Sequence, residues 1–297
     1  MSNAIPVTAA REDLILQHDV FAPFQDLLVH GTSTRRLGNT LPDLLGKHEM
    51  ACRQRLSHMV RLLGLPTGRQ RPLVTGKLQH GNHVGHLKTR VRYRPGSIIQ
   101  AGSTDQGISC TYMHTSSGIP TIAICAPPPI DALITRSTSV LLMIRSADCA
   151  PVMFFDPRHH AIGIAHAGLL GVLTEIAVHT AQDMHQVFKT RMEDLHVAVG
   201  PSIGRCCYDL GQSHLWNSLR RESHFKGHPL PPADTRHFDL RRRLYNQLRR
   251  LKIPTSHIEI SDVCTACSGR FFSNAATRPE HRHIRERHAT LIGLRRR

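Results

Sequence analysis

The stretch SADCAPVMFFDPRHHAIGIAHAGLLG, residues 146–171, decides the fold. It holds two continuous apolar runs, Val152–Phe155 and Ala161–Ala165, on either side of the turn-forming residues 156–159. Apolar runs of this length predict strands that are buried on both faces, and the short polar turn between them predicts a hairpin. The sequence therefore predicts a sheet that is covered on both sides.

A hairpin centred on that turn would place Cys149 directly opposite His166. Directly opposed side chains have Cβ atoms about 4.5–5.5 Å apart, so a thiolate and an imidazole there could share one metal ion. Both residues lie where a strand meets a loop, a frequent position for catalytic groups. A Cys/His pair on a hairpin is also a common structural arrangement, and with 22 histidines the composition does not select a third ligand.

The rest of the chain alternates strands and helices without a strict βαβ order, which predicts mixed α and β layers. Residues 91–130 are rich in Gly, Ser, Thr and Pro and predict an irregular insertion with one strand near 121–125. We expect an N-terminal extension over 1–26, a single catalytic domain over 27–294 and a basic tail over 295–297. Other strands are expected within 27–38, 70–84, 140–144, 195–199 and 257–260, and helices within 42–63, 172–188 and 240–251.

Composition limits the class of protein. Of the 297 residues 40 % are hydrophobic, and no run approaches the roughly 18–20 apolar residues of a membrane span. The charged residues among the first 24 interrupt any signal-peptide core, so we expect a cytoplasmic protein whose eight cysteines are thiols.

The net charge of +16 comes largely from residues 241–252 and 278–297. Aromatic residues make up 5 % of the chain and are not interleaved with the basic runs, so we do not expect a nucleic-acid groove. We interpret the basic residues as a solvated face and a frayed tail, which includes His281, His283 and His288. A positive surface would also attract phosphate.

Separate motifs, in order along the chain, resemble those of the YfiH/laccase-domain family. The resemblance covers most of residues 27–294. In the motif HAG-Trp-Arg-Gly the chain has Leu169 and Leu170 at the Trp and Arg positions. The matching motifs are Thr34-Arg35, Arg53 in CRQRL, Gln79-His80-Gly81, DALIT at 131–135, ADC-P and HAG within 146–171, GPSIGRCCYDLG at 200–211 and CTACSGRFFS at 264–273.

The resemblance implies an α+β fold, a four-layer α/β/β/α sandwich of mixed sheets that is shared with CNF-type toxin cysteine hydrolases. It also implies a zinc ion held by His80, Cys149 and His166, which would be the catalytic site. The implied activity is phosphorolysis of adenosine, inosine, guanosine or methylthioadenosine, together with adenosine deamination. The partners are then a purine nucleoside and phosphate, and Arg35 and Arg53 are candidates for binding phosphate because guanidinium groups pair bidentately with it. We expect a monomer or small homo-oligomer.

Four alternatives stay open. The family is also described as copper-dependent polyphenol oxidases, but several copper sites need many histidine ligands, and one His/Cys/His set does not supply them. A catalytically impaired relative would follow from the loss of the Trp-Arg pair and from Asn274-Ala275-Ala276 in place of Tyr-Arg-Arg. Cys149 and His166 could instead be the nucleophile and base of a cysteine hydrolase. The basic face could belong to a polyanion-binding module.

Four further cysteines lie in the last two motifs. Cys264 and Cys267 have the spacing of half a zinc knuckle, and Cys206 and Cys207 would complete four thiolates. Because adjacent cysteines rarely bind one ion well, we interpret all four as structural thiols.

Overall fold

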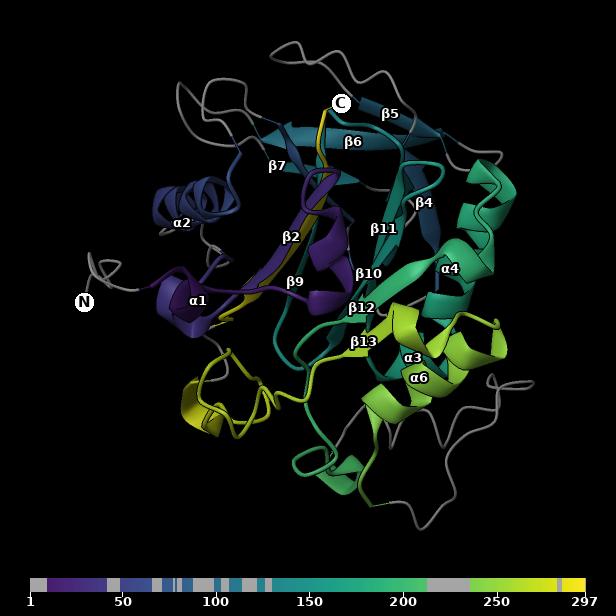
Figure 1. Ribbon diagram of the computed structural model, residues 1–297. Helices are drawn as coiled ribbons and strands as arrows, with labels where there is room; N and C mark the ends of the chain where they lie inside the picture. The colour runs from purple at the N-terminus through teal and green to yellow at the C-terminus, as the bar shows by residue number, and fades with distance from the viewer. Residues whose placement is uncertain are drawn as a thin grey trace.

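The computed structural model describes residues 10–41, 49–65, 71–76, 78, 82–87, 99–102, 107–113, 122–125, 130–212, 236–281 and 285–296. Their strands form two sheets that lie face to face, and helices cover the outer face of each sheet (Figure 1). The fold is therefore the expected α+β sandwich of four layers, α/β/β/α. None of the described helices is both long enough and apolar enough to cross a membrane.

The first sheet has eight strands among the described residues. Strands β3 and β9 pair in parallel, as do β3 and β7, and the other pairs are antiparallel, so the sheet is mixed. In spatial order its strands are β1 (Ile15–Leu16), β2 (Leu28–Ser33), β14 (His288–Leu294), β9 (Leu141–Ser146), β3 (Leu73–Gly76), β7 (Ile122–Cys125), β6 (Gly107–Met113) and β5 (Ile99–Gly102).

The second sheet has six strands among the described residues and is mixed as well. Its central pair, β10 and β11, is the hairpin within the quoted stretch. In spatial order the strands are β13 (Ile258–Ile260), β12 (His196–Val199), β10 (Ala150–Asp156), β11 (Ala161–Ala167), β8 (Ala132–Thr135) and β4 (Val84–Leu87).

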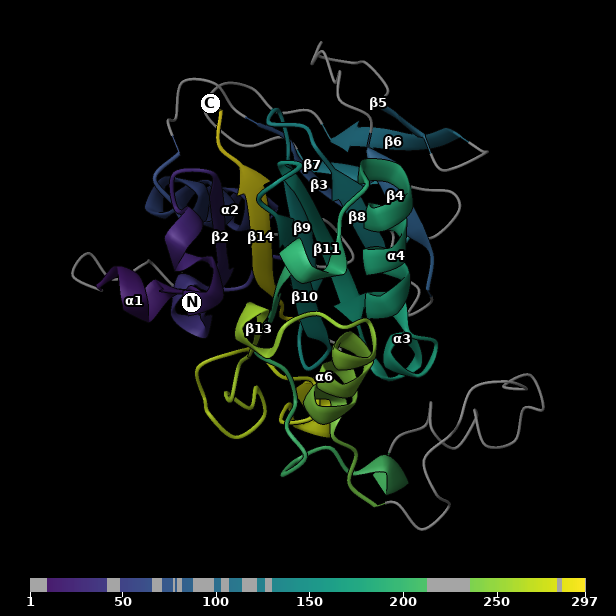
Figure 2. The same ribbon diagram turned by 45° about the vertical axis from the view of Figure 1, so that its right-hand side comes forward.

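The helices form the outer layers. Figure 2 shows α4 and α6 beside the six-stranded sheet, and α2 on the far side of the eight-stranded one. Among the described residues the α-helices are α1 (Arg11–Leu14), α2 (Glu49–Leu62), α3 (Leu169–Leu173), α4 (Ile176–Phe188) and α6 (Leu240–Arg250). Short 3-10 helices are η1 (Asp19–Phe24), η2 (Arg35–Leu37), η3 (Met192–Asp194), η4 (Leu210–Gln212), η6 (Thr255–His257) and η7 (Pro279–His281).

The place of strand β10 explains why the run Val152–Phe155 is apolar without interruption. Successive side chains of a strand point to opposite faces. Val152 and Phe154 pack into the core shared with α3, α4 and α6, whereas Met153 and Phe155 pack into the core between the two sheets. A strand between two hydrophobic cores has no solvent face, so the positions of β10 from Ala150 to Phe155 are all apolar.

The structure changes several sequence predictions. Residues 288–294, expected in a frayed tail, form β14, which is buried at every position and lies inside the eight-stranded sheet. The strand was not predicted because charged residues flank this run on both sides. The stretch 91–130 contributes β5, β6 and β7 instead of one strand. The expected helix over 172–188 is divided at Glu175, whose φ of 61° is left-handed.

The hairpin register is also different from the prediction. Pro151, not Cys149, is paired with His166, so the register is displaced by two residues. The side-chain period of a strand is two, so a slip of two keeps each side chain on its predicted face. Residues 11–24, expected to belong to an extension, contribute β1 to the sheet and Phe21 to the core between the sheets.

Candidate functional site

His166 occupies the end of β11 on the face that looks toward the other sheet, as Ile162 and Ile164 do. The residue is 3 % exposed. Its backbone N–H donates to the carbonyl of Asp131 at 2.8 Å, and its Nδ1 lies 3.4 Å from Oδ1 of the same residue. Asp131 is itself 1 % exposed and immediately precedes β8, the neighbour of β11. The carboxylate therefore fixes the orientation of the ring and directs Nε2 to the opposite side.

Cys149 immediately precedes β10, one residue after Asp148, and contacts the His166 ring. Burial lowers the pKa of His166, but the charge of the Cys149 thiolate and hydrogen bonds with Asp131 and Cys149 outweigh it and raise the pKa to about 9. Without a metal the His166 imidazole accordingly carries a proton at neutral pH. A metal ion that bound both groups would displace this proton.

Asp148 holds the backbone that presents Cys149. Its φ of 94° lies in the left-handed region, a conformation that a non-glycine residue adopts only where its surroundings enforce it. Oδ1 accepts a hydrogen bond from the Thr265 hydroxyl at 2.7 Å, and Oδ2 accepts one from the N–H of Ala275 at 2.8 Å. Its carbonyl accepts from the N–H of Ile203 at 2.8 Å. Two distant loops are thus tied to the residue beside Cys149.

Two cavities meet at Cys149. One, of about 330 Å³, is also lined by His166, Ser146 and Arg145. The other, of about 680 Å³, is lined by Leu169, Ile203, Tyr208 and further residues. Both cavities share the following lining residues: Ala147, Cys149, Asn274, Arg285 and Arg287.

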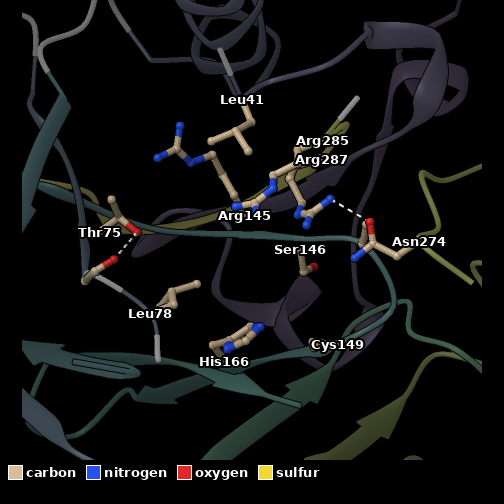
Figure 3. Close-up of a pocket in the computed structure, with 12 residues that line it drawn as sticks. Leu41, Thr75, Leu78, Arg145, Ser146, Cys149, His166, Asn274, Arg285 and Arg287 are labelled. Carbon is tan, nitrogen blue, oxygen red and sulfur yellow. Dashed lines mark hydrogen bonds between the residues drawn. The ribbon is translucent and has the colours of Figure 1, made fainter. Parts of the chain in front are cut away.

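Arginines give the shared region a positive potential. Arg287 donates to Oδ1 of Asn274 at 2.9 Å. Burial, the largest effect, lowers the pKa of its guanidinium, and the charge of Cys149 opposes that shift. Figure 3 shows Arg145, Arg285 and Arg287 on one side of β9 and His166 on the other. Burial, the largest effect, lowers the pKa of Arg145 to about 10, which leaves it a cation at neutral pH. The arrangement suits an anion that lies close to the Cys149 thiol.

Comparison with known proteins identifies the family. Residues 46–295 match the family described as multi-copper polyphenol oxidoreductase laccase. The chain belongs to this laccase family. "Purine nucleoside phosphorylase YlmD" of Geobacillus stearothermophilus is 36 % identical over 223 residues, which are 68 % of this chain and 79 % of the relative.

Two further similarities concern a second enzyme name and the fold of the laccase family. "Adenosine deaminase RL5" of an unknown prokaryotic organism is 27 % identical over 150 residues, 49 % of this chain and 56 % of that protein. The crystal structure of YlmD from Geobacillus stearothermophilus superposes with a TM-score of 0.64 at 24 % identity, over 95 % of this chain and 97 % of that one. At this identity the structural similarity to YlmD shows a shared fold and nothing about activity.

The residues that the laccase-family resemblance pointed to are found in different places. Cys149 and His166 lie together, whereas His80 falls outside the described residues. Arg35 lines a separate cavity, where its guanidinium lies 5.4 Å from the Phe272 ring centroid. Arg53 is 4 % exposed and bonds to Glu49 one turn earlier in α2.

Sequence reasoning missed other residues of this laccase-family site. Asp131 was noticed only as part of a motif, and Arg145, Arg285 and Arg287 were not singled out. A signal existed for Arg145, because a cation in the otherwise apolar run LLMIRS contradicts a purely structural strand. The structure also brings together four cysteines that were interpreted as structural thiols and that could hold a metal ion: Cys206, Cys207, Cys264 and Cys267.

Proposed function

We propose that the chain is a zinc-dependent purine nucleoside phosphorylase whose zinc ion is held by His80, Cys149 and His166. The observation that carries the proposal is the contact between the Cys149 thiol and the His166 imidazole, beside a cavity, with the buried Asp131 holding the ring. The name of the Geobacillus relative supports the reaction. The expected substrates are phosphate with adenosine, inosine, guanosine or methylthioadenosine.

The donor set fits zinc. A thiolate and an imidazole are typical zinc ligands, and a carboxylate bonded to the second ring nitrogen is the usual partner of a zinc-bound histidine. With His80, which is a prediction from the resemblance, the set would have three protein ligands and an open position. A zinc ion bound there would supply a positive charge that stabilises negative charge developing on a reactant.

Phosphate would bind at Arg285 and Arg287, because both line both cavities next to Cys149. Guanidinium groups neutralise phosphate and orient it through paired hydrogen bonds. The purine and ribose would occupy the larger cavity against Leu169 and Ile203. Burial, and then the charges of Cys149 and Asp148, raise the pKa of Tyr208, so its hydroxyl stays protonated and can donate to the nucleoside.

The leucines at 169 and 170 change the character of this site relative to the family motif. Leu169 is 3 % exposed and lines the larger cavity, where it offers an apolar wall instead of an aromatic plane. The cation that the motif would supply is absent from residue 170, which leaves the anion to Arg285 and Arg287. We therefore expect weaker stacking on the base but retained binding of phosphate. Arg35 and Arg53 stay predictions as phosphate ligands.

The test is release of free purine base from inosine or adenosine, followed by chromatography with and without phosphate. Wild-type protein should release base only with phosphate and should contain zinc. Cys149→Ala should lose both the activity and the zinc that this site binds, whereas Cys52→Ala, which removes a buried thiol from α2, should keep both. Wild-type turnover in Cys149→Ala would overturn the proposal.

Arg287→Gln tests the place of phosphate. Loss of one charged hydrogen bond, about 1.5–3 kcal/mol, should raise the KM for phosphate by roughly 10–150-fold and leave the KM for the nucleoside nearly unchanged. Arg242→Gln, an exposed position on α6, is the matched control and should behave as wild type. An unchanged KM for phosphate in Arg287→Gln would move the phosphate elsewhere.

Adenosine deamination is a second activity that the deaminase among the relatives favours. It predicts inosine and ammonia from adenosine without phosphate, and the same assay separates it from phosphorolysis. Copper-dependent phenol oxidation, which the family description favours, predicts several coppers per chain and consumption of oxygen. Cytoplasmic location and a monomeric or small homo-oligomeric state stay predictions.

A cysteine hydrolase is the remaining alternative that the geometry favours. Asp131, His166 and Cys149 have the order of orienting acid, base and nucleophile. In metal-free protein an alkylating agent should then modify Cys149 faster than the other cysteines, and hydrolysis should survive a chelator. Loss of turnover on chelation and its return with zinc favour the phosphorylase.

A further inference from the structure

Four cysteines from two loops meet outside the site described above. Cys206 and Cys207 follow β12, and Cys264 and Cys267 follow β13. Their sulfur atoms all lie within 4.8 Å of one another. None of the four is in a disulfide. Cys207 also lines the larger cavity, so the cluster stands behind one wall of the candidate active site.

The topology of the second sheet explains why these loops meet. Strands β12 and β13 pair in parallel, with Val197 opposite Ile258 and Val199 opposite Ile260. Parallel neighbours end at the same edge of a sheet, so the segments that follow them leave side by side. A further bridge joins Ser202 to Cys264, and the N–H of Thr265 donates to the Ser202 carbonyl at 3.0 Å.

The spacing of the sulfur atoms matches a tetrahedral metal site. Zinc–sulfur bonds of about 2.3 Å in a tetrahedron place the sulfur atoms about 3.8 Å apart. The Sγ atoms of Cys206 and Cys267 are 3.8 Å apart. The upper limit of 4.8 Å means that the most distant pair would close by about 1 Å, a side-chain adjustment. A disulfide would instead require a separation near 2.05 Å.

The backbone around Cys264 is arranged to stabilise negative charge on sulfur. The N–H of Gly204 donates to its Sγ at 3.2 Å, and the N–H groups of Ala266 and Cys267 also face it. Hydrogen bonds to an anionic acceptor are stronger than those to a neutral one. Gly204 permits this approach, because a Cβ there would lie 3.1 Å from the Cys206 sulfur and 3.3 Å from Cys264 Cβ.

Arg241 on α6 fastens the two loops together beside the cluster. It donates to the carbonyl of Ser202 at 2.7 Å on the first loop and to the carbonyls of Asp262 and Val263, at 2.7 and 2.8 Å, on the second. The guanidinium thus adds a positive charge near the four sulfurs. Four thiolates around one divalent ion carry a net charge of about −2, which a neighbouring cation offsets.

We propose that Cys206, Cys207, Cys264 and Cys267 bind one zinc ion as a closed four-thiolate site, distinct from the site at Cys149. Each thiol that binds loses its proton to solvent, so uptake of the ion releases protons. With four protein ligands the ion has no open position, and its role is structural.

The ion would hold the wall of the cavity in place. Ile203 and Thr265, one from each loop, bond to Asp148, the residue that presents Cys149. Tyr208 follows the cluster directly and lines the larger cavity. Removal of the ion should therefore loosen the loops around Cys149 without removing any group that contacts substrate.

The first experiment counts metal in the Cys149→Ala protein, in which only the four-thiolate site remains. Purified full-length protein should contain about one zinc per chain by mass spectrometry of the metal. When cobalt replaces zinc, the absorption spectrum should show a thiolate-to-cobalt charge-transfer band whose intensity corresponds to four sulfur ligands. If the Cys149→Ala protein contains no zinc and shows no charge-transfer band, the four-thiolate site is overturned. If it contains one zinc per chain but the wild-type protein does not turn over nucleosides, only the proposed phosphorylase activity is overturned.

The second experiment changes one ligand and keeps the thiol at Cys149. Cys267→Ser should lose one zinc per chain, whereas Cys267→His should keep it, because an imidazole replaces a thiolate as a zinc ligand. Ser268→Ala, the exposed neighbour, is the matched control. If Cys267→Ser does not fold, a chelator added to the Cys149→Ala protein, which keeps only the four-thiolate site, should lower the Tm, and zinc should restore it. Full zinc content in Cys267→Ser, or a Cys206–Cys267 disulfide in the native protein, would overturn the proposal.

Discussion

Replacing His288 by glutamine should reduce the loss of stability that the wild-type protein suffers between pH 7 and pH 5. His288 begins β14 and is 0 % exposed. Its Nε2 lies 3.0 Å from the Ser146 hydroxyl, and its Nδ1 has no hydrogen-bond partner among the described residues. Protonation would bury a charge and an unsatisfied N–H. Burial, and then the charge of Arg287, accordingly lower the pKa of His288 to about 3.

The sign and size follow from the two pKa values. In the unfolded chain the pKa of a histidine is about 6.5. As the pH falls below 6.5, His288 binds a proton in the unfolded chain but stays neutral in the folded one. The free energy of unfolding therefore keeps its full value above pH 6.5 and declines as the pH falls toward 3. At pH 5 this one residue should lower the free energy of unfolding by about 2 kcal/mol. Glutamine has a similar reach to Nε2 and does not titrate, so that contribution disappears.

The assay is urea unfolding followed by circular dichroism at pH 7 and pH 5. The quantity to compare is the change in unfolding free energy between the two pH values, because other groups titrate equally in both proteins. His288→Gln should lose about 2 kcal/mol less than wild type over this interval. His281→Gln, at an exposed position, is the control and should follow wild type. Equal losses in His288→Gln and wild type would refute the reasoning.

Three further changes test other parts of the molecule. Asp131→Asn removes the charge that holds His166, so metal affinity at the Cys149 site should fall roughly 10–100-fold in competition with a chelator; unchanged affinity would contradict that role. Thr265→Val removes the 2.7 Å hydrogen bond to Asp148 at nearly constant volume and should cost about 1.5–3 kcal/mol of unfolding free energy, measured in urea. Gly76→Ala would place a Cβ 2.0 Å from the Ile130 carbonyl oxygen, so its Tm should fall by an amount that corresponds to about 2–3 kcal/mol, and a wild-type Tm would show that β3 can shift.

The layers of the fold could be predicted from the sequence because local pattern determines them. The runs 152–155 and 161–165 have no polar residue, and a strand between two cores is the arrangement that tolerates this. β14 was missed for the opposite reason. Its apolar run HATLIGL is local, but arginines on both sides make the average composition of residues 278–297 resemble a solvated tail.

The register of the central hairpin could be predicted only approximately from the position of its turn residues. The turn residues located the hairpin, yet the pairing slipped by two residues, which no hydrophobic pattern detects because both registers keep every side chain on the same face. The predicted contact between Cys149 and His166 is present in spite of the displaced register, because diagonal neighbours on one face of a sheet remain within reach of each other.

The remaining groups of the site depend on pairing between distant segments. Asp131 reaches His166 through β8 and β11, and Arg287 reaches the Cys149 cavity because it immediately precedes β14. Neither relation leaves a periodic signal in the sequence. The resemblance supplied His80, which lies outside the described residues and stays a prediction.

The position of β14 has a consequence for biosynthesis. It pairs with β2 on one side and β9 on the other, although β2 is made more than two hundred and fifty residues earlier, as the pairing of Thr32 with Thr290 shows. Until residue 294 has left the ribosome, the edges of β2 and β9 lack their common neighbour and expose unpaired backbone groups. A nascent chain that stops before β14 has emerged would be prone to aggregate. Chaperones that act during translation should therefore bind chiefly to chains of that length.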